Sequence, residues 1–361
     1  MSGPLDACRH QCYAQPSNRG TNEFMTPSHF IGIDWGTSSM RAYLFDAAGQ
    51  VQDQREADWG VMNLPLAPGH DEQDRESRFR QAFWQLLEDW LAQPGTSRHV
   101  TACGMVGSKQ GWCEAPYIPV PVSMAGLAGA LTTVDVGQGV TLGIAPGLLQ
   151  QGALPDVMRG EETQIAGVPA LLERQGQDAR GRWLLGLPGT HSKWAAVRDG
   201  TILRFDTFMT GELYGVLLQH SILGRTLGDD PSLPDDEEAR QSFLSGVANA
   251  TGESGRKGLL GTIFSSRTLS LTGRLTGPQQ REYLSGLLVG HELQGLFDSL
   301  DDDWRSARMA LIGRPGLCQR YRQALNALGR DADILSEEAG IHGLWSLIRQ
   351  HTSHATLTET L

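Results

Sequence analysis

Residues 29–46 of the chain read HFIGIDWGTSSMRAYLFD, two apolar runs separated by a turn of small and hydroxyl-bearing residues. Apolar runs of this length, bounded by Gly, Ser and Thr, are typical of β-strands. The pattern predicts an antiparallel hairpin with strands over 29–34 and 40–45. Asp34 stands at the end of the first strand, so we expect its carboxylate to face the space beside the turn.

A related pattern returns later in the chain. Residues 187–199 repeat the order of residues 33–46: a strand, a Gly-Thr turn, a serine two positions further on, a second apolar strand and a turn. Self-similarity of this kind indicates duplicated structural units. We therefore expect two related α/β lobes. The alternative is two unrelated hairpins, because short β-turn-β units are common.

Length and composition agree with two lobes. The chain has 361 residues, 40% of them hydrophobic, and a formal net charge of −11. These values exclude a short disulfide scaffold, a disordered tail and a free-standing basic nucleic-acid binder. We expect a disordered leader over 1–25, an N-terminal lobe over 26–170, a C-terminal lobe over 180–335 and a terminal helix over 336–350. Translation could begin at Met1 or at Met25.

Targeting and redox features point to the cytoplasm. No apolar run reaches the roughly 18 to 20 residues that span a bilayer, and the leader lacks the apolar segment of a secretory signal. Cys8 and Cys12 flank His10, which is compatible with a metal site. The chain has five cysteines, an odd number, and the other three stand singly, so reduced thiols are the favoured interpretation.

The two Gly-Thr turns are candidate phosphate sites. Backbone amides of a tight turn can converge on an anion, and the Asp34 carboxylate beside such a turn suits Mg²⁺, which prefers oxygen ligands. The alternative for Asp34 is a turn in which it bonds only its own backbone. The second turn has no carboxylate. Two phosphate-binding turns with a single acid for the metal would suit the asymmetric phosphate chain of a nucleoside triphosphate. The predicted phosphate ligands are Gly36, Thr37, Ser38, Gly189, Thr190, His191 and Ser192.

Residues 158–164 read MRGEETQ, two adjacent acids between a glycine and an apolar helix. Either Glu161 or Glu162 could act as a general base that orients a substrate hydroxyl, and Arg159 could bind an anionic group of the substrate. The alternative is that the acids only cap the helix.

Two glycine-rich turns complete the candidate site. Residues 311–316, LIGRPG, follow a strand, and the open backbone at Gly313 and Gly316 could admit adenine or ribose. Residues 104–112, GMVGSKQGW, form a loop with many free amides that could contact a small substrate. Ordinary connections are the alternative for both. The predicted substrate contacts of the second loop are Gly104, Ser108, Gln110 and Trp112.

Taken together, these segments resemble the sugar kinase, hexokinase, Hsp70 and actin superfamily of two-lobed proteins that use ATP. Residues 34–38 resemble its first phosphate motif, 188–192 its second and 311–316 its adenosine motif. The resemblance implies the actin-like ATPase (ribonuclease H-like) fold, an α/β architecture with a duplicated mixed β-sheet lobe. It also implies that the terminal helix returns to the N-terminal lobe.

More narrowly, the chain resembles the 2-dehydro-3-deoxygalactonokinase family of galactonate breakdown. Six stretches carry this resemblance: 33–37, 104–112, 158–164, 187–194, 209–213 and 287–293. The family implies transfer of the ATP γ-phosphoryl group to the 6-hydroxyl of 2-dehydro-3-deoxy-D-galactonate, with ATP and Mg²⁺ as cofactors. On this interpretation Asp34 organises Mg²⁺, Glu162 or Glu161 is the base, and Arg159 with the 104–112 loop holds the substrate carboxylate.

Two other functions stay open. One is a kinase of a related sugar or keto acid, because the phosphate turns would be shared. The other is an actin- or Hsp70-like ATPase that acts on polypeptide, for which no stretch of sequence remains to form a peptide-binding domain. A sugar-responsive regulator is disfavoured because no helix-turn-helix or basic patch is present. We expect a small-molecule partner, no nucleic acid and no membrane, and a homodimer remains open.

Overall fold

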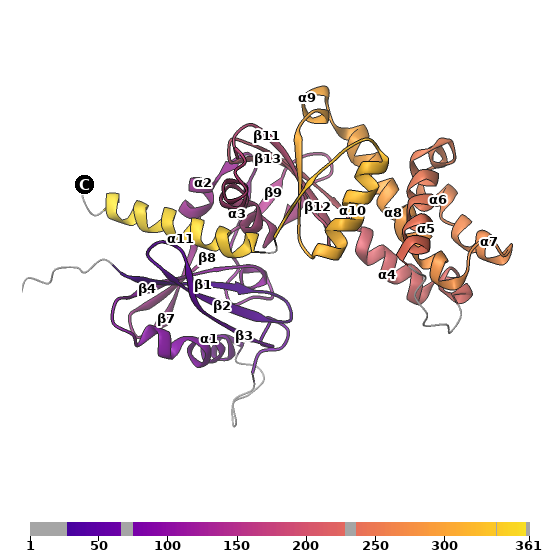
Figure 1. Ribbon diagram of the computed structural model, residues 1–361. Coiled ribbons are helices and arrows are strands. Elements are labelled where there is room, and N and C mark those ends of the chain that lie inside the picture. The colour runs from indigo at the N-terminus through magenta and orange to yellow at the C-terminus, as the bar shows by residue number, and fades with distance from the viewer. Residues whose placement is uncertain (1–26, 66–74, 228–235, 337, 359–361) are drawn as a thin grey trace, which may run out of the picture.

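The computed structural model describes residues 27–65, 75–227, 236–336 and 338–358. The expected leader over 1–25, with Cys8, His10 and Cys12, lies outside the described residues. Figure 1 shows two sheets with helices packed on and between them, and a helical region at one end. Among the described helices, none combines the length and the apolar content needed to cross a bilayer.

The first sheet has the strand order β3-β2-β1-β4-β8-β7. β1 and β2 form the predicted antiparallel hairpin, and β4 and β8 continue the sheet in parallel. β3 was not predicted, because its sequence VQDQREA is almost wholly polar and exposed and so lacks the alternation of a half-buried strand. The bounds are β1 His29–Trp35, β2 Met40–Asp46, β3 Val51–Ala57, β4 Thr96–Cys103, β7 Thr132–Gly137 and β8 Val140–Ile144.

The second sheet, β15-β14-β11-β12-β13-β6, repeats this arrangement. β11, β12 and β13 are antiparallel neighbours, and β14 and β15 follow β11 in parallel, as β4 and β8 follow β1. The expected duplicated mixed-sheet α/β fold is therefore confirmed. The bounds are β6 Val122–Ser123, β11 Arg182–Leu187, β12 Ser192–Arg198, β13 Thr201–Phe208, β14 Arg308–Ile312 and β15 Asp333–Leu335.

The division of the chain between the sheets is less simple than two consecutive spans. β6 lies within the 26–170 span expected for the first lobe, yet it pairs with β13 in the second sheet. A small third sheet, β10-β9-β5, is formed by Asp156–Met158, Gly147–Gln150 and Tyr117–Pro119. The segment that precedes the second lobe in the chain therefore already contacts it.

Alternation along β1 assigns its two faces to different cores. Ile31, Ile33 and Trp35 pack with α1 (Arg75–Leu91), whose Phe79 and Phe83 are fully buried. The opposite face packs against α11 (Ala339–Thr358), because a Cβ atom on Gly32 would lie 3.3 Å from the Cβ of Leu344. Asp34 is on this second face, since side chains alternate along a strand.

Two helices lie between the sheets. α3 (Glu161–Arg174) packs along α11, and side chains from both helices share one core with side chains from both sheets. Figure 1 shows α11 lying between the first sheet and α3. The two lobes are thus joined by a common hydrophobic core as well as by the chain.

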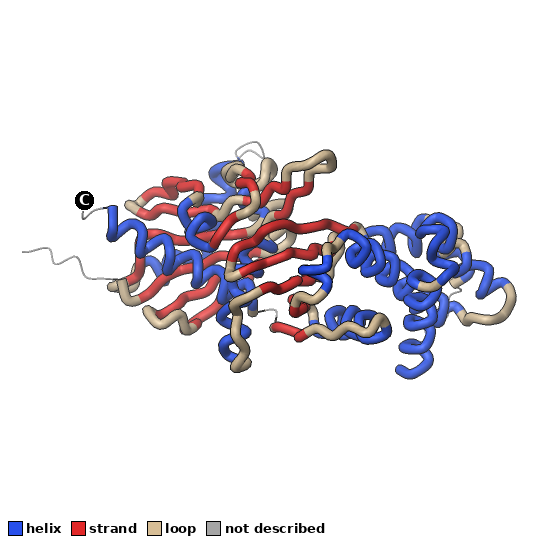
Figure 2. The backbone as a smooth tube through the Cα atoms, turned by 90° about the horizontal axis from the view of Figure 1, so that it is seen from above, coloured by secondary structure: helices blue, strands red, loops and turns tan. Residues whose placement is uncertain are grey.

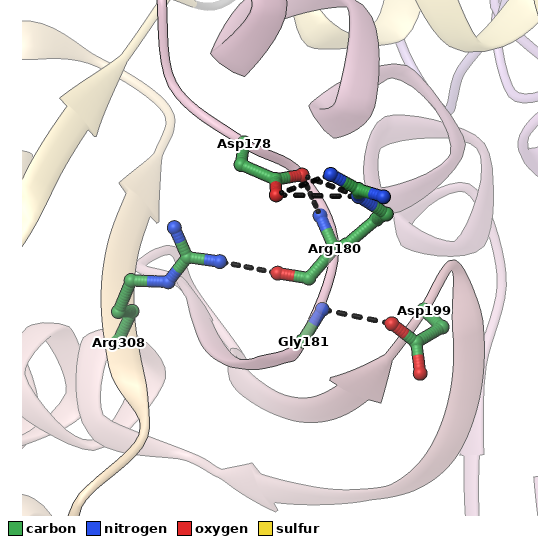
Figure 3. Close-up of polar contacts among 5 residues, drawn as sticks. All are labelled: Asp178, Arg180, Gly181, Asp199 and Arg308. Atoms are coloured by element: carbon green, nitrogen blue, oxygen red, sulfur yellow. Dashed lines mark hydrogen bonds and ion pairs between the residues drawn. The ribbon is translucent and has the colours of Figure 1, made fainter.

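Polar contacts fix the segment that leads from α3 into the second sheet (Figure 3). Nε of Arg180 donates to both oxygens of Asp178, at 3.0 and 3.2 Å. The amide of Gly181 donates to Asp199 at 2.8 Å, and Arg308 donates to the carbonyl of Arg180. These bonds hold the segment after α3 against the β12–β13 hairpin and β14.

The far end of the molecule is helical, as Figure 2 shows from above. α5 and α8 approach each other closely through glycines: a Cβ on Gly286 would lie 1.8 Å from the carbonyl oxygen of Phe243, and one on Gly246 2.2 Å from that of Tyr283. The helices beyond β13 are α4 Thr210–His220, α5 Asp236–Thr251, α6 Gly258–Thr262, α7 Ser265–Leu271, α8 Gly277–Ser299, α9 Asp302–Arg305 and α10 Pro315–Ala327, and α2 (Met124–Gly129) precedes them.

Candidate active site

A cleft of about 1150 Å³ lies where turns of both sheets meet the first turn of α3. Its lining includes Asp34 and Arg41 from the first sheet, Gly189 and Thr190 from the second, and Glu161 from α3. Large clefts between lobes are where small ligands usually bind. Predicted site residues from distant parts of the sequence therefore border one space.

The turn after β1 is held rigidly beside this cleft. The amide of Gly36 donates to Ser39 at 2.9 Å, and the carbonyls of Gly36 and Thr37 accept from Val61 and Met62 at 3.0 and 3.2 Å. Thr37 and Ser38 are exposed at the tip of the turn. Asp34 itself lines the cleft, whereas the predicted ligands Gly36, Thr37 and Ser38 are not among its lining residues.

Asp34 has a charged neighbour that we did not predict. The hairpin register places Arg41 directly opposite Asp34, and Nε of Arg41 donates to Glu56 at 2.9 Å. Burial raises the pKa of Asp34, Arg41 lowers it, and Glu56 raises it further. The register of the predicted hairpin was the signal that could have identified Arg41.

Gly104 brings three segments of the site together. Its φ is +90°, and a Cβ there would lie 2.9 Å from the carbonyl of Trp35 and 3.3 Å from Oδ1 of Asp34. A Cβ on Gly160 would in turn lie 3.7 Å from Cα of Gly104. The close approach and the positive φ both require glycine at position 104.

No residue of the 104–112 loop lines the cleft, Gly104 included. Trp112 stacks on Phe79 at 5.8 Å, Ser108 is buried, and Gln110 is exposed with its carbonyl accepting from Arg75. The hydroxyl of Ser108 and Nε1 of Trp112 are buried without a hydrogen-bond partner in the described part of the chain. These three predicted contacts therefore stand apart from the cleft.

The adjacent acids at the start of α3 have different surroundings. Glu161 lines the cleft and accepts from the amide of Arg159 at 3.1 Å. Glu162 is fully buried, and its two oxygens accept from the amide of Gly160 at 2.6 Å and the hydroxyl of Thr163 at 2.9 Å. Burial, and next the charge of Glu161, raise the pKa of Glu162 to about 7. Only Glu161 is in position to meet a substrate in the cleft.

A buried lysine acts on Glu161. Burial raises the pKa of Glu161, and hydrogen bonds from backbone amides together with the nearby ammonium group of Lys193 oppose that rise. Nζ of Lys193 donates to the carbonyl of Val157 at 2.8 Å and to Thr207 at 2.6 Å, so Lys193 joins β12 to the strand that leads into α3. Lys193 is not among the site residues predicted from the sequence.

Arg159 lines the cleft with unused donors. Its Nη2 donates to the carbonyl of Ala115 at 2.7 Å, and the guanidinium lies 4.5 Å from the ring centroid of Tyr117. Nε and Nη1 are buried and have no partner among the residues that the structure describes. Buried donors without acceptors are costly, which favours an acceptor-rich ligand next to this side chain.

In the second turn, Gly189, Thr190 and His191 line the cleft or border it closely. The start of α4 packs closely against this turn. The amide of Glu212 donates to the carbonyl of Thr190 at 2.9 Å, and a Cβ on Gly211 would lie 2.3 Å from the carbonyl oxygen of Gly189. The side chains of His191 and Glu212 also pair.

Ser192 is the exception in the second turn. It is fully buried, and its hydroxyl lies 2.9 Å from the hydroxyl of Tyr321. Its side chain is thus engaged in the protein interior rather than directed at the cleft, which does not fit the predicted phosphate contact.

The remaining end of the cleft is partly apolar. Leu288, Val289 and Leu317 line it, and the ion pair of Glu282 with Arg320 lies among them. The two predicted glycines of this region differ. Gly313 has a φ of +140° and lines the cleft, and a Cβ on it would lie 3.6 Å from the carbonyl oxygen of Pro188. Gly316 is exposed and is not a lining residue.

Comparison with known sequences adds an independent finding. A family model described as 2-keto-3-deoxy-galactonokinase matches residues 34–347. The chain is 33% identical over 325 residues to a protein of Rhizobium meliloti (strain 1021) named "Probable 2-dehydro-3-deoxygalactonokinase DgoK1", covering 88% of this chain and 95% of that one. It is 31% identical over 326 residues to the 2-dehydro-3-deoxygalactonokinase of Escherichia coli (strain K12), covering 88% and 97%.

Comparison with solved structures agrees. The fold is similar to a crystal structure from Sinorhizobium meliloti described as a candidate 2-dehydro-3-deoxygalactonokinase, with a TM-score of 0.71 and 31% sequence identity. The similarity covers 89% of this chain and 98% of that chain. The similarity thus extends over both sheets and the cleft between them.

Proposed function

The chain belongs to the 2-keto-3-deoxy-galactonokinase family, and from this membership we propose that it transfers the γ-phosphoryl group of ATP to the 6-hydroxyl of 2-dehydro-3-deoxy-D-galactonate. The products are ADP and the 6-phosphate of the sugar acid. One observation carries the proposal beyond membership: Asp34, Glu161, Arg159 and the Gly189–Thr190 turn border a single cleft. Because the reaction consumes ATP, we also propose a cytoplasmic site of action.

The nucleotide occupies the side of the cleft formed by the second lobe. The amides of the Gly189–Thr190 turn bind phosphate oxygens, and the turn at 36–38 approaches them from the other lobe. The adenosine lies against the apolar end of the cleft, where Gly313 leaves the backbone open and Leu288 and Leu317 form a wall. Because backbone amides bind the phosphates in this arrangement, ATP binding does not require a basic surface patch.

Mg²⁺ fits the residues present. The described part of the chain offers no cluster of three or more His, Cys, Asp or Glu side chains that could hold a metal. Magnesium in kinases usually takes only one or two carboxylates, with phosphate oxygens and waters as its other ligands. Asp34, a half-buried carboxylate that lines the cleft, would supply that ligand, and the bound cation would offset phosphate charge.

The acceptor occupies the side of the cleft near α3. Phosphoryl transfer through a loose transition state depends mainly on positioning and on charge stabilisation. Glu161 accepts a hydrogen bond from the 6-hydroxyl and aligns its oxygen with the γ-phosphorus. The guanidinium of Arg159, whose side chain lines the cleft, attracts the carboxylate of the sugar acid through its positive charge.

An ADP-release assay over a panel of 2-keto-3-deoxy sugar acids and hexoses tests the proposal. We expect turnover with 2-dehydro-3-deoxy-D-galactonate to exceed that with every other compound by a wide margin in kcat/KM. A higher kcat/KM for a neighbouring sugar or keto acid would reassign the acceptor. Release of ADP that depends on unfolded peptide instead would identify an Hsp70-like ATPase.

A further inference from the structure

Two of the stretches that carry the family resemblance, MTGEL at 209–213 and LLVGHEL at 287–293, contain the polar residues Thr210 and Glu292, which have no role in the proposed chemistry so far. The structure joins them through one contact: the hydroxyl of Thr210 donates to Oε2 of Glu292, 82 positions away. Glu292 lies in the middle of α8 and is 3% exposed. A carboxylate so deeply buried is expensive unless donors surround it.

Three donors surround it. Nε1 of Trp194 donates to Oε1 at 2.7 Å, and the hydroxyl of Tyr321 donates to Oε2 at 2.8 Å, beside that of Thr210. The hydroxyls of Tyr321 and Ser192 are 2.9 Å apart. The carboxylate therefore connects β12, the start of α4 and α10 from within α8.

Each connected element continues directly into the nucleotide side of the cleft. Thr210 and Tyr321 line the cleft themselves, and Ser192 follows the Gly189–Thr190 turn. Gly211, next to Thr210, is packed so closely on the carbonyl of Gly189 that a side chain cannot fit. The position of the first turn of α4 therefore sets the position of the phosphate-binding turn.

We propose that Glu292 is a positioning residue for the nucleotide, which acts through Thr210 to hold the first turn of α4 against the Gly189–Thr190 turn. This inference rests on the ATP use in the proposed function. Burial raises the pKa of Glu292, whereas the hydrogen bonds from Thr210, Trp194 and Tyr321 lower it, so these donors favour the ionised form. Because hydrogen bonds to an ionised acceptor are roughly twice as strong as neutral ones, loss of this charge should weaken ATP binding.

Calorimetric titration with Mg-ATP, in the absence of sugar acid, tests this role. We expect Glu292→Gln, which keeps the shape and loses the charge, to raise the Kd for ATP about tenfold, equivalent to roughly 1.4 kcal/mol. Thr210→Val should do the same, while Thr210→Ser, which retains the hydroxyl, should bind as the wild type does. The double variant should bind no more weakly than the weaker single variant, because both remove one link.

One control variant separates positioning from general stability. Gln280→Met removes a buried bond of α8 to Leu223 that does not involve Glu292. It should lower Tm and leave the Kd for ATP within twofold. Unchanged ATP binding in Glu292→Gln and Thr210→Val, or an equal loss in Gln280→Met, would overturn the proposal.

The same titration keeps this inference separate from the proposed function. If the wild type binds ATP and these variants weaken it, the role of Glu292 stands even when the sugar acid is not phosphorylated. If the sugar acid is phosphorylated and the Kd for ATP is the same in Glu292→Gln and Thr210→Val as in the wild type, only the role of Glu292 is wrong.

Discussion

Glu161 and Glu162 are neighbours in sequence, yet the first turn of α3 sends their carboxylates into different environments. Glu161 borders the cleft, whereas Glu162 turns back to the amide of Gly160 and the hydroxyl of Thr163. The amphipathic pattern of α3 could not distinguish them, because they are adjacent acids in its first turn. The side of the helix that faces the cleft is decided by packing against α11.

We therefore expect Glu161→Gln and Glu162→Gln to have different effects on kcat. Loss of a positioned base typically reduces rates about 100-fold or more, so Glu161→Gln should lower kcat by at least that factor with little change in Tm. Glu162→Gln should leave kcat within a few-fold of the wild type. Steady-state kinetics with thermal unfolding check both, and a fully active Glu161→Gln would remove Glu161 from the mechanism.

Asp34→Asn is the second test at this scale. Asn keeps the size of the side chain but not the charge that would hold Mg²⁺, so turnover should be lost at saturating Mg-ATP. Because burial of the charged form is itself unfavourable at this site, Tm should not fall. Turnover near that of the wild type would show that the metal is held elsewhere.

At the scale of elements, glycines set how closely helices approach. A Cβ on Gly286 would lie 1.8 Å from the carbonyl of Phe243, whereas one on Gly215, in α4, would meet nothing within 4 Å. The contact pairs α8 with α5, and α8 also carries Glu292. Local propensity favours alanine at both positions, so only the packing distinguishes them.

The substitutions Gly286→Ala and Gly215→Ala should therefore have opposite effects. We expect Gly286→Ala to destabilise the protein by about 1 to 3 kcal/mol or more, because backbone must move. Gly215→Ala should stabilise it by about 0.5 to 1 kcal/mol through the unfolded chain. Urea unfolding measures both, and equal effects would contradict the close packing of α5 on α8.

The contact of α11 with β4 includes a histidine pair. His99 of β4 stacks on His351 of α11 with ring centroids 4.3 Å apart, and its Nδ1 lies 2.8 Å from the hydroxyl of Thr141. Burial, and next the proximity of His351, lower the pKa of His99 from 6.5 to about 4. The folded protein therefore holds this histidine neutral.

Acid should loosen this contact. Between pH 6.5 and 4 the unfolded chain binds a proton at position 99 that the folded chain does not, so stability falls as the pH decreases through this window. The loss from this site amounts to at most about 3 kcal/mol. The free energy of unfolding at pH 7.5 and pH 5 should differ less in His99→Gln than in the wild type, and equal differences would exclude the site.

At the scale of the whole molecule, one core joins the lobes. It contains Phe45 from the first sheet, Leu185 from the second, Ile165 from α3 and Leu344 from α11. Since these side chains bury one another, unfolding of either lobe exposes part of the surface that stabilises the other. The division of the fold into two lobes is thus not a division into two independent folding units.

Leu344→Ala should accordingly destabilise the entire protein. Truncation of a fully buried leucine costs about 2 to 5 kcal/mol, and we expect calorimetry to show one transition at a lower Tm. Leu260→Ala, at a position 91% exposed, should leave Tm nearly unchanged. Two separate transitions, of which only one moves, would show that the lobes unfold independently.

Much of the fold was predictable because its signals are local. The hairpin from His29 to Asp46, its repeat near Gly189-Thr190 and the buried helices follow from short-range alternation, turn residues and helical spacing. The predictions failed where the local signal is weak, as for the polar strand β3, or where a short strand such as β6 joins a distant sheet. Strand pairing over such distances is set by the assembled sheet.

For the site, the sequence alone determined which turns and acids were candidates, because amide-bearing turns and strand-end carboxylates are groups that can bind phosphate and Mg²⁺. The tertiary structure decided which of them meet. It directed Glu161 to the cleft, turned Ser192 toward Tyr321, and brought Arg41, Lys193 and the Thr210–Glu292 pair into the site. Lys193 and Glu161, and likewise Thr210 and Glu292, lie far apart in sequence, so no local pattern indicates these contacts, and only the packing of the elements creates them. Arg41 differs, because the hairpin register already places it opposite Asp34.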